Sequence, residues 1–133
     1  MKFKTRPVNI FLIAALATSM ISPVVLAGSG YQAEVVVGST YAAGAKFAAR
    51  LSNDTQQYIG CTNSTTGSAN YDYMSCFARN KSGATFYCYA TGSSAANFIS
   101  ALDTVNDASY LSIEKNSDGT CKVLRVNNSS LYL

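Results

Sequence analysis

Four cysteines most strongly constrain how this chain can fold: Cys61, Cys76, Cys88 and Cys121. The steps between them are 15, 12 and 33 residues. A structural zinc site usually brings cysteines in pairs about two to four residues apart, and a redox-active pair usually has the spacing Cys-x-x-Cys. The sequence has neither pattern. An even number of cysteines in an exported domain is typical of disulfide bonds, so we expect two disulfides and no metal site.

The first 27 residues have the pattern of a cleavable signal peptide of bacterial type. Three basic residues begin it, Lys2, Lys4 and Arg6, and residues 10–26 carry no charge. Small or aliphatic residues precede the expected cleavage site after Ala27. The alternative is an uncleaved membrane anchor, but the apolar run is short for a span and contains Pro23. We therefore expect a periplasmic or extracellular protein without stable membrane insertion, with one small disulfide-stabilised domain over residues 28–133.

Cleavage would also remove the net positive charge of the chain. The whole sequence has 10 Lys and Arg against 7 Asp and Glu, a net charge of +3. Because three of the basic residues lie in the expected signal peptide, 7 basic and 7 acidic residues remain, and the domain has no net charge. A neutral domain has no electrostatic basis for binding nucleic acid or an anionic membrane surface. We therefore expect neither of these partners.

Alternating and β-branched segments predict a domain of strands with one helix. Phe98, Leu102 and Val105 recur at helical spacing, and a serine just before them can cap the helix. The predicted fold class is α+β, an antiparallel sheet of about five to seven strands with one helix, about 94–105, packed on a face. The predicted strands cover residues 33–37, 56–62, 71–79, 84–91, 110–115 and 121–126.

The segment from Ala45 to Leu51 fits two kinds of secondary structure. As a helix it places Phe47 and Leu51 one turn apart, and its alanine content favours that state. As a strand it alternates, with Ala45, Phe47 and Leu51 on one face. Because a good turn follows at residues 52–55, with an extended segment after it, we prefer a β-hairpin here.

The turn between the two aromatic strands bears on the disulfide pairing. If residues 80–83 form an even loop, Arg79 lies opposite Ala84. In that register Cys76 and Cys88 point to opposite faces of the sheet, and a bond between them would need a bulge. We therefore predict the disulfides Cys61–Cys76 and Cys88–Cys121.

No catalytic constellation is recognisable in the sequence. It contains no histidine, which removes the usual general base and the commonest metal ligand. Asp103 and Asp107 are four residues apart, as expected of a solvated helix face. Residues 116–119 supply oxygen ligands but fit a plain turn better than a calcium loop. We therefore predict a protein that is not an enzyme, with no catalytic residue and no cofactor.

Among the residue types of this sequence, tyrosine is the one that points most directly to a binding surface. Tyr71, Tyr73, Tyr87 and Tyr89 fall in the two predicted aromatic strands, and we take them as candidate binding residues. In the even-loop register, Tyr73 lies on one side of the sheet, while Tyr87 and Tyr89 lie on the other. The helix can cover one of these sides. The other is then either core beneath a further layer, with hydroxyl groups at its rim, or an exposed aromatic patch.

Three hypotheses for function follow from these features. The first is an exported, non-catalytic binding module that acts on a protein partner, such as an inhibitor or a component of an envelope complex. The second is a structural or surface subunit that assembles with itself through an exposed edge strand. The third is a small hydrolase, which would need two carboxylates that converge in a pocket. We favour the first hypothesis, and the sequence leaves the oligomeric state open.

Overall fold

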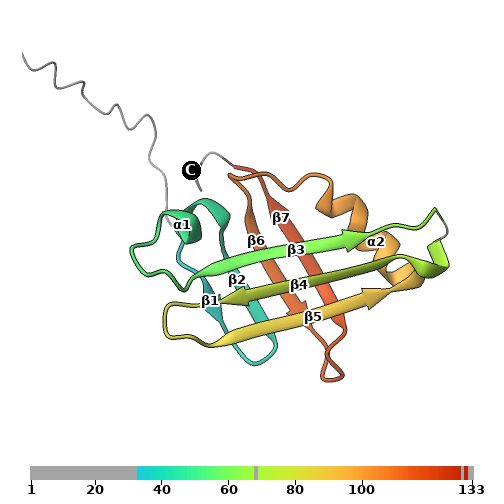
Figure 1. The fold of residues 1–133 in the computed structure, drawn as a ribbon, viewed down its shortest axis with the longest axis horizontal. Coiled ribbons are helices and arrows are strands. Elements are labelled where there is room, and N and C mark those ends of the chain that lie inside the picture. Colours follow the sequence, from blue (N-terminus) through green and yellow to red (C-terminus); the bar gives the residue numbers. More distant parts are fainter. Residues whose placement is uncertain (1–32, 68, 130, 132–133) are drawn as a thin grey trace, which may run out of the picture.

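Seven strands, two α-helices and one 3-10 turn follow one another in the described part of the chain (Figure 1). The computed structural model describes residues 33–67, 69–129 and 131, so the expected signal peptide lies outside it. In chain order the elements are β1 (Val36–Val37), β2 (Tyr41–Ala45), α1 (Lys46–Leu51), β3 (Tyr58–Ser64), the 3-10 turn η1 (Ala69–Tyr71), β4 (Tyr73–Arg79), β5 (Thr85–Thr91), α2 (Gly92–Leu102), β6 (Tyr110–Lys115) and β7 (Cys121–Asn127).

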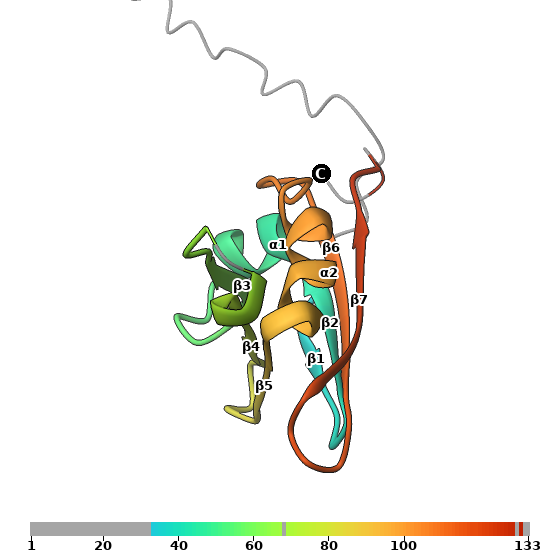
Figure 2. The same ribbon diagram turned by 90° about the vertical axis from the view of Figure 1, so that its right-hand side faces the viewer.

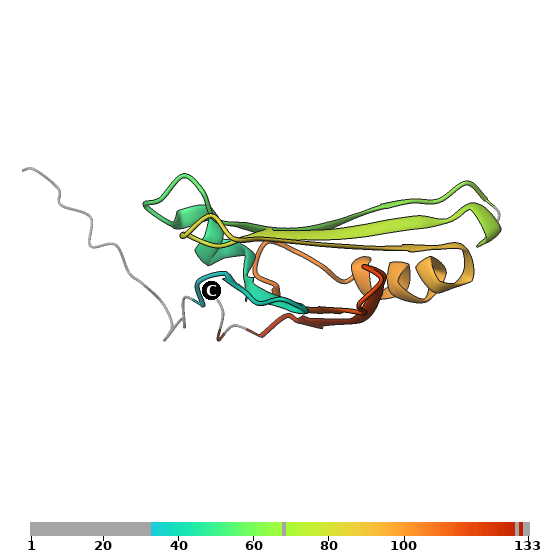
Figure 3. The same cartoon turned by 90° about the horizontal axis from the view of Figure 1, so that it is seen from below.

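The strands divide between two antiparallel sheets that lie in separate layers. The large sheet has the order β1-β2-β6-β7, and the small sheet has the order β3-β4-β5. The large sheet and α2 lie together on one side of the small sheet (Figures 2 and 3). The predicted α+β class is confirmed, with seven strands, a helix packed on a sheet face and two disulfides, although the strands form two sheets.

The core lies between the small sheet and the second layer. β5 alternates strictly, with Phe86, Cys88 and Ala90 buried and the residues between them exposed. Met74 of β4 and Ile113 of β6 contribute to the same core cluster and are fully buried. Because successive residues of a strand point to opposite faces, the small sheet has one buried face and one open face.

Helix α2 closes one end of this core beneath the small sheet. Its residues Phe98, Ile99 and Leu102 pack against the buried cluster. After Leu102 the chain tightens into a turn, in which the N–H of Val105 donates to the carbonyl of Leu102 over 2.9 Å. Asp103 caps this end of the helix through its backbone, so Asp103 and Asp107 do not share a helix face.

The two disulfides join the predicted pairs of cysteines. Cys61–Cys76 links β3 to β4 within the small sheet, with Cα atoms 4.0 Å apart. Cys88–Cys121 links β5 of the small sheet to β7 of the large sheet, with Cα atoms 5.0 Å apart. They close loops of 15 and 33 residues. In a loop-entropy model these bonds stabilise the fold by about 3 and 4 kcal/mol, respectively.

The turn between β4 and β5 is odd, so the predicted even loop is wrong. Arg79 pairs with Thr85 and not with Ala84. Ala84 instead accepts a hydrogen bond from the N–H of Asn80 over 3.1 Å, and Gly83 has φ +88°. A tight turn that ends in a left-handed glycine adds one residue to the loop. Every side chain of β5 therefore points to the face opposite to the predicted one.

This shift by one residue regroups the cysteines and the tyrosines. Cys76 lies directly opposite Cys88, and both point into the core, so the prediction that they face opposite sides is wrong. Tyr87 and Tyr89 lie on the same face as Tyr73, which also contradicts the even-loop register. The disulfide pairing is correct although the parity argument that led to it is wrong.

The segment Lys46–Leu51 is the helix α1, so the preferred β-hairpin is wrong there. The pairing of β2 with β6 ends where Ala45 meets Tyr110, at the first residue of β6. Beyond that point no strand of the large sheet lies beside the chain, and its backbone groups need other partners. A segment with two adjacent alanines satisfies them at low cost in side-chain entropy by forming a helix. Ala48 and Ala49 are its buried residues.

Candidate functional site

The open face of the small sheet gathers most of the exposed aromatic residues. Neither the large sheet nor α2 lies over this face (Figures 2 and 3). We call the set of five side chains on it the aromatic face: Tyr58 from β3, Tyr73 and Phe77 from β4, and Tyr87 and Tyr89 from β5. The four tyrosines are between 37% and 50% exposed. The sheet therefore presents large rings to its surroundings and does not bury them.

Register decides which rings become neighbours on this face. Tyr87 lies directly opposite Phe77, and Tyr89 lies opposite Ser75. On the other side of β4, Gly60 lies opposite Phe77. A Cβ at Gly60 would lie 3.6 Å from the ring of Phe77, so that ring lies close to the backbone of β3. The centre of the face is consequently a row of a glycine and two rings.

Contacts among the rings fix their positions. The hydroxyl oxygens of Tyr73 and Tyr87 are 2.6 Å apart and share a hydrogen bond. The rings of Tyr87 and Tyr89 are stacked with centroids 6.5 Å apart, and Tyr58 meets Phe77 edge-on at 6.0 Å. The bond to Tyr73 raises the pKa of Tyr87, because it favours the neutral hydroxyl over tyrosinate. The rings are therefore ordered before any partner binds.

The remainder of the aromatic face is polar but almost uncharged. The hydroxyl oxygens of Thr62 and Ser75 lie 3.2 Å apart between the rings. Among the outward-pointing residues described in β3, β4 and β5, Arg79 is the one that carries a charge. Its guanidinium donates to the side-chain oxygen of Gln56 over 3.2 Å at one end of the sheet. The face thus offers rings and hydroxyl groups without a strong field.

A shallow hollow of about 280 Å³ adjoins the face at Tyr58. Ala49 and Ile59 form part of its apolar lining. Its charged residues are Lys46 and Arg50 of α1 and Asp107, whose carboxylate lies 3.7 Å from Lys46 and 3.0 Å from Arg50. Two positive charges against one negative charge leave the hollow with a net charge of +1 beside its apolar lining.

Of the four tyrosines predicted as binding residues, the structure brings three together. Tyr73, Tyr87 and Tyr89 belong to the aromatic face, whereas Tyr71 lies in η1, before β4 begins, and is 74% exposed. Sequence reasoning predicted the Cys61–Cys76 bond but did not extend the pairing of the two strands from it, and therefore missed Tyr58. Once Cys61 is bonded to Cys76 across the two strands, alternation places Tyr58 on the outer face. The disulfide was therefore the sequence signal that could have located it.

Two of the carboxylates considered in the sequence, Asp107 and Asp118, have partners within the protein. Asp107 pairs with Lys46 and Arg50, as described above. Asp118 accepts hydrogen bonds from the hydroxyl and the N–H of Thr120, and these bonds lower the pKa of its carboxyl group. Over the described ranges, the one group of three or more metal-capable side chains close enough to share an ion is Cys76, Cys88 and Cys121, all of them in disulfides.

Comparison with known proteins gives no relative from which a function could be transferred. No protein-family model, no curated protein and no solved structure matches this chain. Within the described residues, none of the helices has the length and apolar character needed to cross a membrane. The site has to be interpreted from its own chemistry.

Proposed function

We propose that this protein is an exported, non-catalytic binding module whose aromatic face engages a protein partner. The observation that carries the proposal is the open sheet face on which Tyr58, Tyr73, Tyr87 and Tyr89 remain 37% to 50% exposed. Exposed rings gathered on one face mark interaction sites more often than rings scattered singly over a surface. The two disulfides suit an oxidising location, the periplasm or the outside of the cell.

The residue types of the face favour protein recognition. Tyrosine provides a large contact area with little side-chain entropy to lose, and small residues such as Ser, Thr and Gly provide adaptable hydrogen bonds. Antibody paratopes use the same combination of side chains. Here the hydrogen bond between Tyr73 and Tyr87 and the stacking of Tyr87 on Tyr89 order the rings in advance. Such pre-organisation lowers the entropic cost of binding.

Other classes of partner fit this surface less well. Nucleic acid would require several Lys or Arg residues to contact phosphates, and the face carries Arg79 alone among its described outward-pointing residues. Small molecules are usually held in enclosed, concave sites, whereas the aromatic face is an open sheet. We therefore propose a folded protein whose surface has an uncharged, partly apolar patch with hydrogen-bond acceptors. One side chain of the partner would enter the hollow beside Tyr58. In this proposal the present protein acts as an inhibitor of the partner or as a component of an envelope complex.

Assembly with itself through an edge strand is less well supported. β7 forms one edge of the large sheet, and an unprotected edge can pair with another chain. Its residues Lys122 and Arg125 are exposed, and charged residues on an edge strand oppose such pairing. Arg125 also forms an ion pair of 2.8 Å with Glu114 of the neighbouring strand β6.

The test is capture of the partner by face variants of the full chain, exported with its own signal and purified in oxidised form. The double variant Tyr87→Ser/Tyr89→Ser removes the centre of the aromatic face. Tyr41→Ser is the matched control, because Tyr41 is 50% exposed, as is Tyr87, but lies on the large sheet. We expect one protein to be retained at constant stoichiometry by the wild type and by the control, and to be lost with the double variant.

Equilibrium unfolding separates a binding role from a role in stability. The double variant removes the Tyr73–Tyr87 hydrogen bond and the stacking of Tyr87 on Tyr89. Each of these contributes about 0.5–1.5 kcal/mol, so the free energy of unfolding should fall by about 1–3 kcal/mol while the protein stays folded. A partner still held by the double variant would refute the proposed face. So would recovery of this chain alone, which would favour self-assembly.

A further inference from the structure

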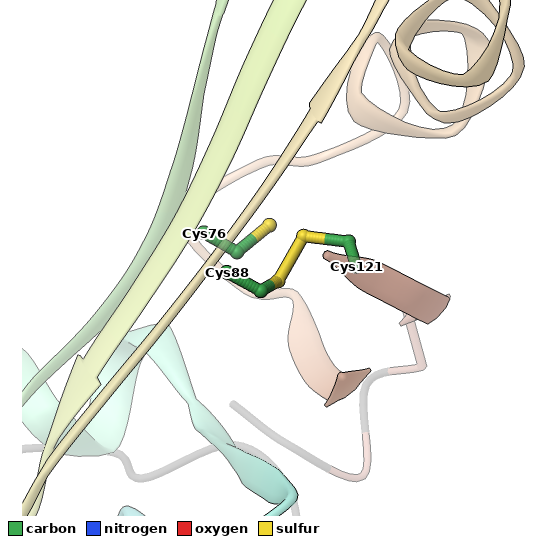
Figure 4. Close-up of side chains that lie close together, drawn as sticks. All are labelled: Cys76, Cys88 and Cys121. Atoms are coloured by element: carbon green, nitrogen blue, oxygen red, sulfur yellow. A yellow bond between two sulfur atoms is a disulfide. The ribbon is translucent and has the colours of Figure 1, made fainter. Parts of the chain in front are cut away.

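The two disulfides meet inside the core. The sulfur atoms of Cys76, Cys88 and Cys121 all lie within 4.8 Å of one another. Figure 4 shows the sulfur of Cys76 beside the Cys88–Cys121 bond, with the cysteines coming from three different strands. Cys76 is at the same time bonded to Cys61. One sulfur of the first disulfide is therefore a neighbour of both sulfurs of the second.

Access to solvent differs between the two bonds. Cys76 and Cys88 are 0% exposed and Cys121 is 8% exposed, whereas Cys61 is only partly buried. An external thiolate therefore reaches the sulfur of Cys61 first. Attack on a disulfide expels the sulfur that is not attacked. Attack at Cys61 thus releases Cys76 as a thiolate beside the second bond.

We infer that Cys76 is an internal thiol–disulfide exchange site, which passes reduction from the surface at Cys61 to the buried Cys88–Cys121 bond. The thiolate of Cys76 attacks the sulfur of Cys88, a new Cys76–Cys88 bond forms, and Cys121 leaves as a thiolate that takes up a proton. The co-reactant is a dithiol. Its first thiol forms a mixed disulfide with Cys61. Its second thiol then attacks the first sulfur of the co-reactant, which releases Cys61 as a thiol, and the co-reactant leaves as the oxidised, cyclic disulfide. Two electrons enter, and the protein ends with one disulfide and two thiols.

The strand register favours Cys88 over Cys121 as the sulfur that is attacked. Cys76 and Cys88 are direct partners on the neighbouring strands β4 and β5, and both point into the core. The Cβ atoms of such a pair are about 4.5–5.5 Å apart, and a disulfide needs about 3.5–4.5 Å. A small approach of two adjacent strands is therefore enough to form the new bond.

The exchange changes what the disulfides hold together. Cys88–Cys121 joins the small sheet to the large sheet, whereas a Cys76–Cys88 bond lies within the small sheet. One reductant molecule at the surface would thus remove the covalent bond between the two layers. The described strands would remain, and the layers would be held by non-covalent contacts, such as the hydrogen bond from the N–H of Tyr89 to the carbonyl of Gly119, and by the chain that connects them.

The experiment treats the oxidised, folded wild type with one equivalent of dithiothreitol, followed by an acid quench and maleimide labelling. Trypsin cleavage after Arg50, Arg79, Lys81, Lys115 and Lys122 places Cys61 and Cys76 together in peptide 51–79. Cys88 lies in peptide 82–115 and Cys121 in peptide 116–122. We expect a new covalent pair between peptides 51–79 and 82–115, with labels on Cys61 and Cys121. Peptide 82–115 still joined to 116–122, with labels on Cys61 and Cys76, would refute the exchange.

Two variants test the role of Cys76 separately. In Cys61→Ser, a free Cys76 remains beside the second bond, and the pair of peptides 51–79 and 82–115 should form without any reductant. In Cys76→Ala, the relay is missing, and dithiothreitol should reduce Cys88–Cys121 more than about tenfold more slowly than in the wild type, since a neighbouring thiolate has a high effective concentration. Equal rates in Cys76→Ala and the wild type would overturn the inference. Should Cys76→Ala fold poorly, the wild-type and Cys61→Ser maps still decide it.

Discussion

Two glycines in strands should respond to alanine with opposite signs. Gly44 of β2 is buried, and a Cβ there would lie 2.9 Å from the Cα of Val35 and 3.0 Å from its Cγ2. The first of these contacts is with backbone, so either β2 or the segment before β1 must move. At Gly60 of β3, the nearest atoms to a Cβ belong to the ring of Phe77, at 3.6 and 3.8 Å. Those distances are ordinary van der Waals contacts.

The magnitudes follow from two opposing effects. Replacing glycine restricts the unfolded chain and stabilises the fold by about 0.4–1 kcal/mol where the native backbone accepts alanine. Overpacking a filled site costs about 1–3 kcal/mol. Gly60→Ala should therefore raise the free energy of unfolding by about 0.4–1 kcal/mol. Gly44→Ala should lower it by about 0.5–2 kcal/mol.

Urea unfolding of the oxidised protein, followed by circular dichroism, measures both variants. For a domain of this size the denaturant slope is about 1–2 kcal/mol per molar, so the two midpoints should differ by about 1 M. The slopes should equal that of the wild type, because neither change alters the surface exposed on unfolding. If Gly44→Ala were as stable as the wild type, or if both variants shifted in the same direction, the close approach of Val35 to β2 would be refuted.

Three further predictions concern the turns and the titrating groups. Gly83→Ala should lower the free energy of unfolding by about 1–2 kcal/mol in the same urea assay, because φ is +88° there and a Cβ disfavours that conformation; an unchanged midpoint would contradict the odd loop. Tyr73→Phe should lower the pKa of Tyr87 towards its ordinary value of 10.0 in an NMR titration of ¹³C-labelled tyrosine rings, since the bond between the two hydroxyls is the main cause of the raised pKa. That bond stabilises the fold below the ordinary pKa of the phenol, and its contribution disappears as the pH rises through the raised value. Asp118→Asn should flatten the acid side of the profile of stability against pH. The hydroxyl of Thr120 lowers the pKa of Asp118 from its ordinary value of 3.8. The carboxylate therefore stabilises the fold above the ordinary pKa, and this contribution is lost as the pH falls through the lowered pKa. An acid limb identical to that of the wild type would contradict this last prediction.

In the hairpin of β4 and β5, the sequence predicted the positions of the strands but not their register. Both strands were located within two residues, because alternating aromatic residues and a polar turn are strong local signals. The predicted register of β5 against β4 was wrong because the positive φ of Gly83, which adds one residue to the turn, was not anticipated. The turn between β6 and β7 has the same form, with an asparagine four residues before its last residue and Gly119 at φ +87°. The pattern Asn-x-x-Gly-x thus predicts an odd loop, and applying it would have grouped the tyrosines correctly.

The strand β2 was not predicted, and the helix α1 was the alternative that was not preferred. Tyr41–Ala45 is rich in alanine and glycine, which have weak preference for strands. It becomes a strand because it pairs with β6, and small residues are needed where Val35 crosses close to it. Lys46–Leu51 becomes a helix where that pairing stops. In both segments the tertiary partner decides the outcome, and a single sequence does not reveal that partner.

The candidate site was predicted in part. Tyrosine content alone identified three of the five residues on the aromatic face, Tyr73, Tyr87 and Tyr89, without their common orientation. Of the remaining two, Phe77 follows from alternation along β4, which places it on the face of Tyr73, whereas Tyr58 depends on the register of β3 against β4. The predicted Cys61–Cys76 bond fixes that register once the two cysteines are placed directly opposite each other. Local composition thus finds the rings, and the long-range bond places them.

The positions of the disulfides along the chain also determine how far the protein can be stretched. The bonds span 15 and 33 residues, and these two segments do not overlap. At about 3.4 Å for each extended residue, the segments hold roughly 50 and 110 Å of contour length that a force on the two ends of the oxidised chain cannot extract. The second segment contains the whole of α2 and β6. In an oxidising compartment, pulling would therefore lengthen the chain only outside these segments, and single-molecule traces would gain the missing length on reduction.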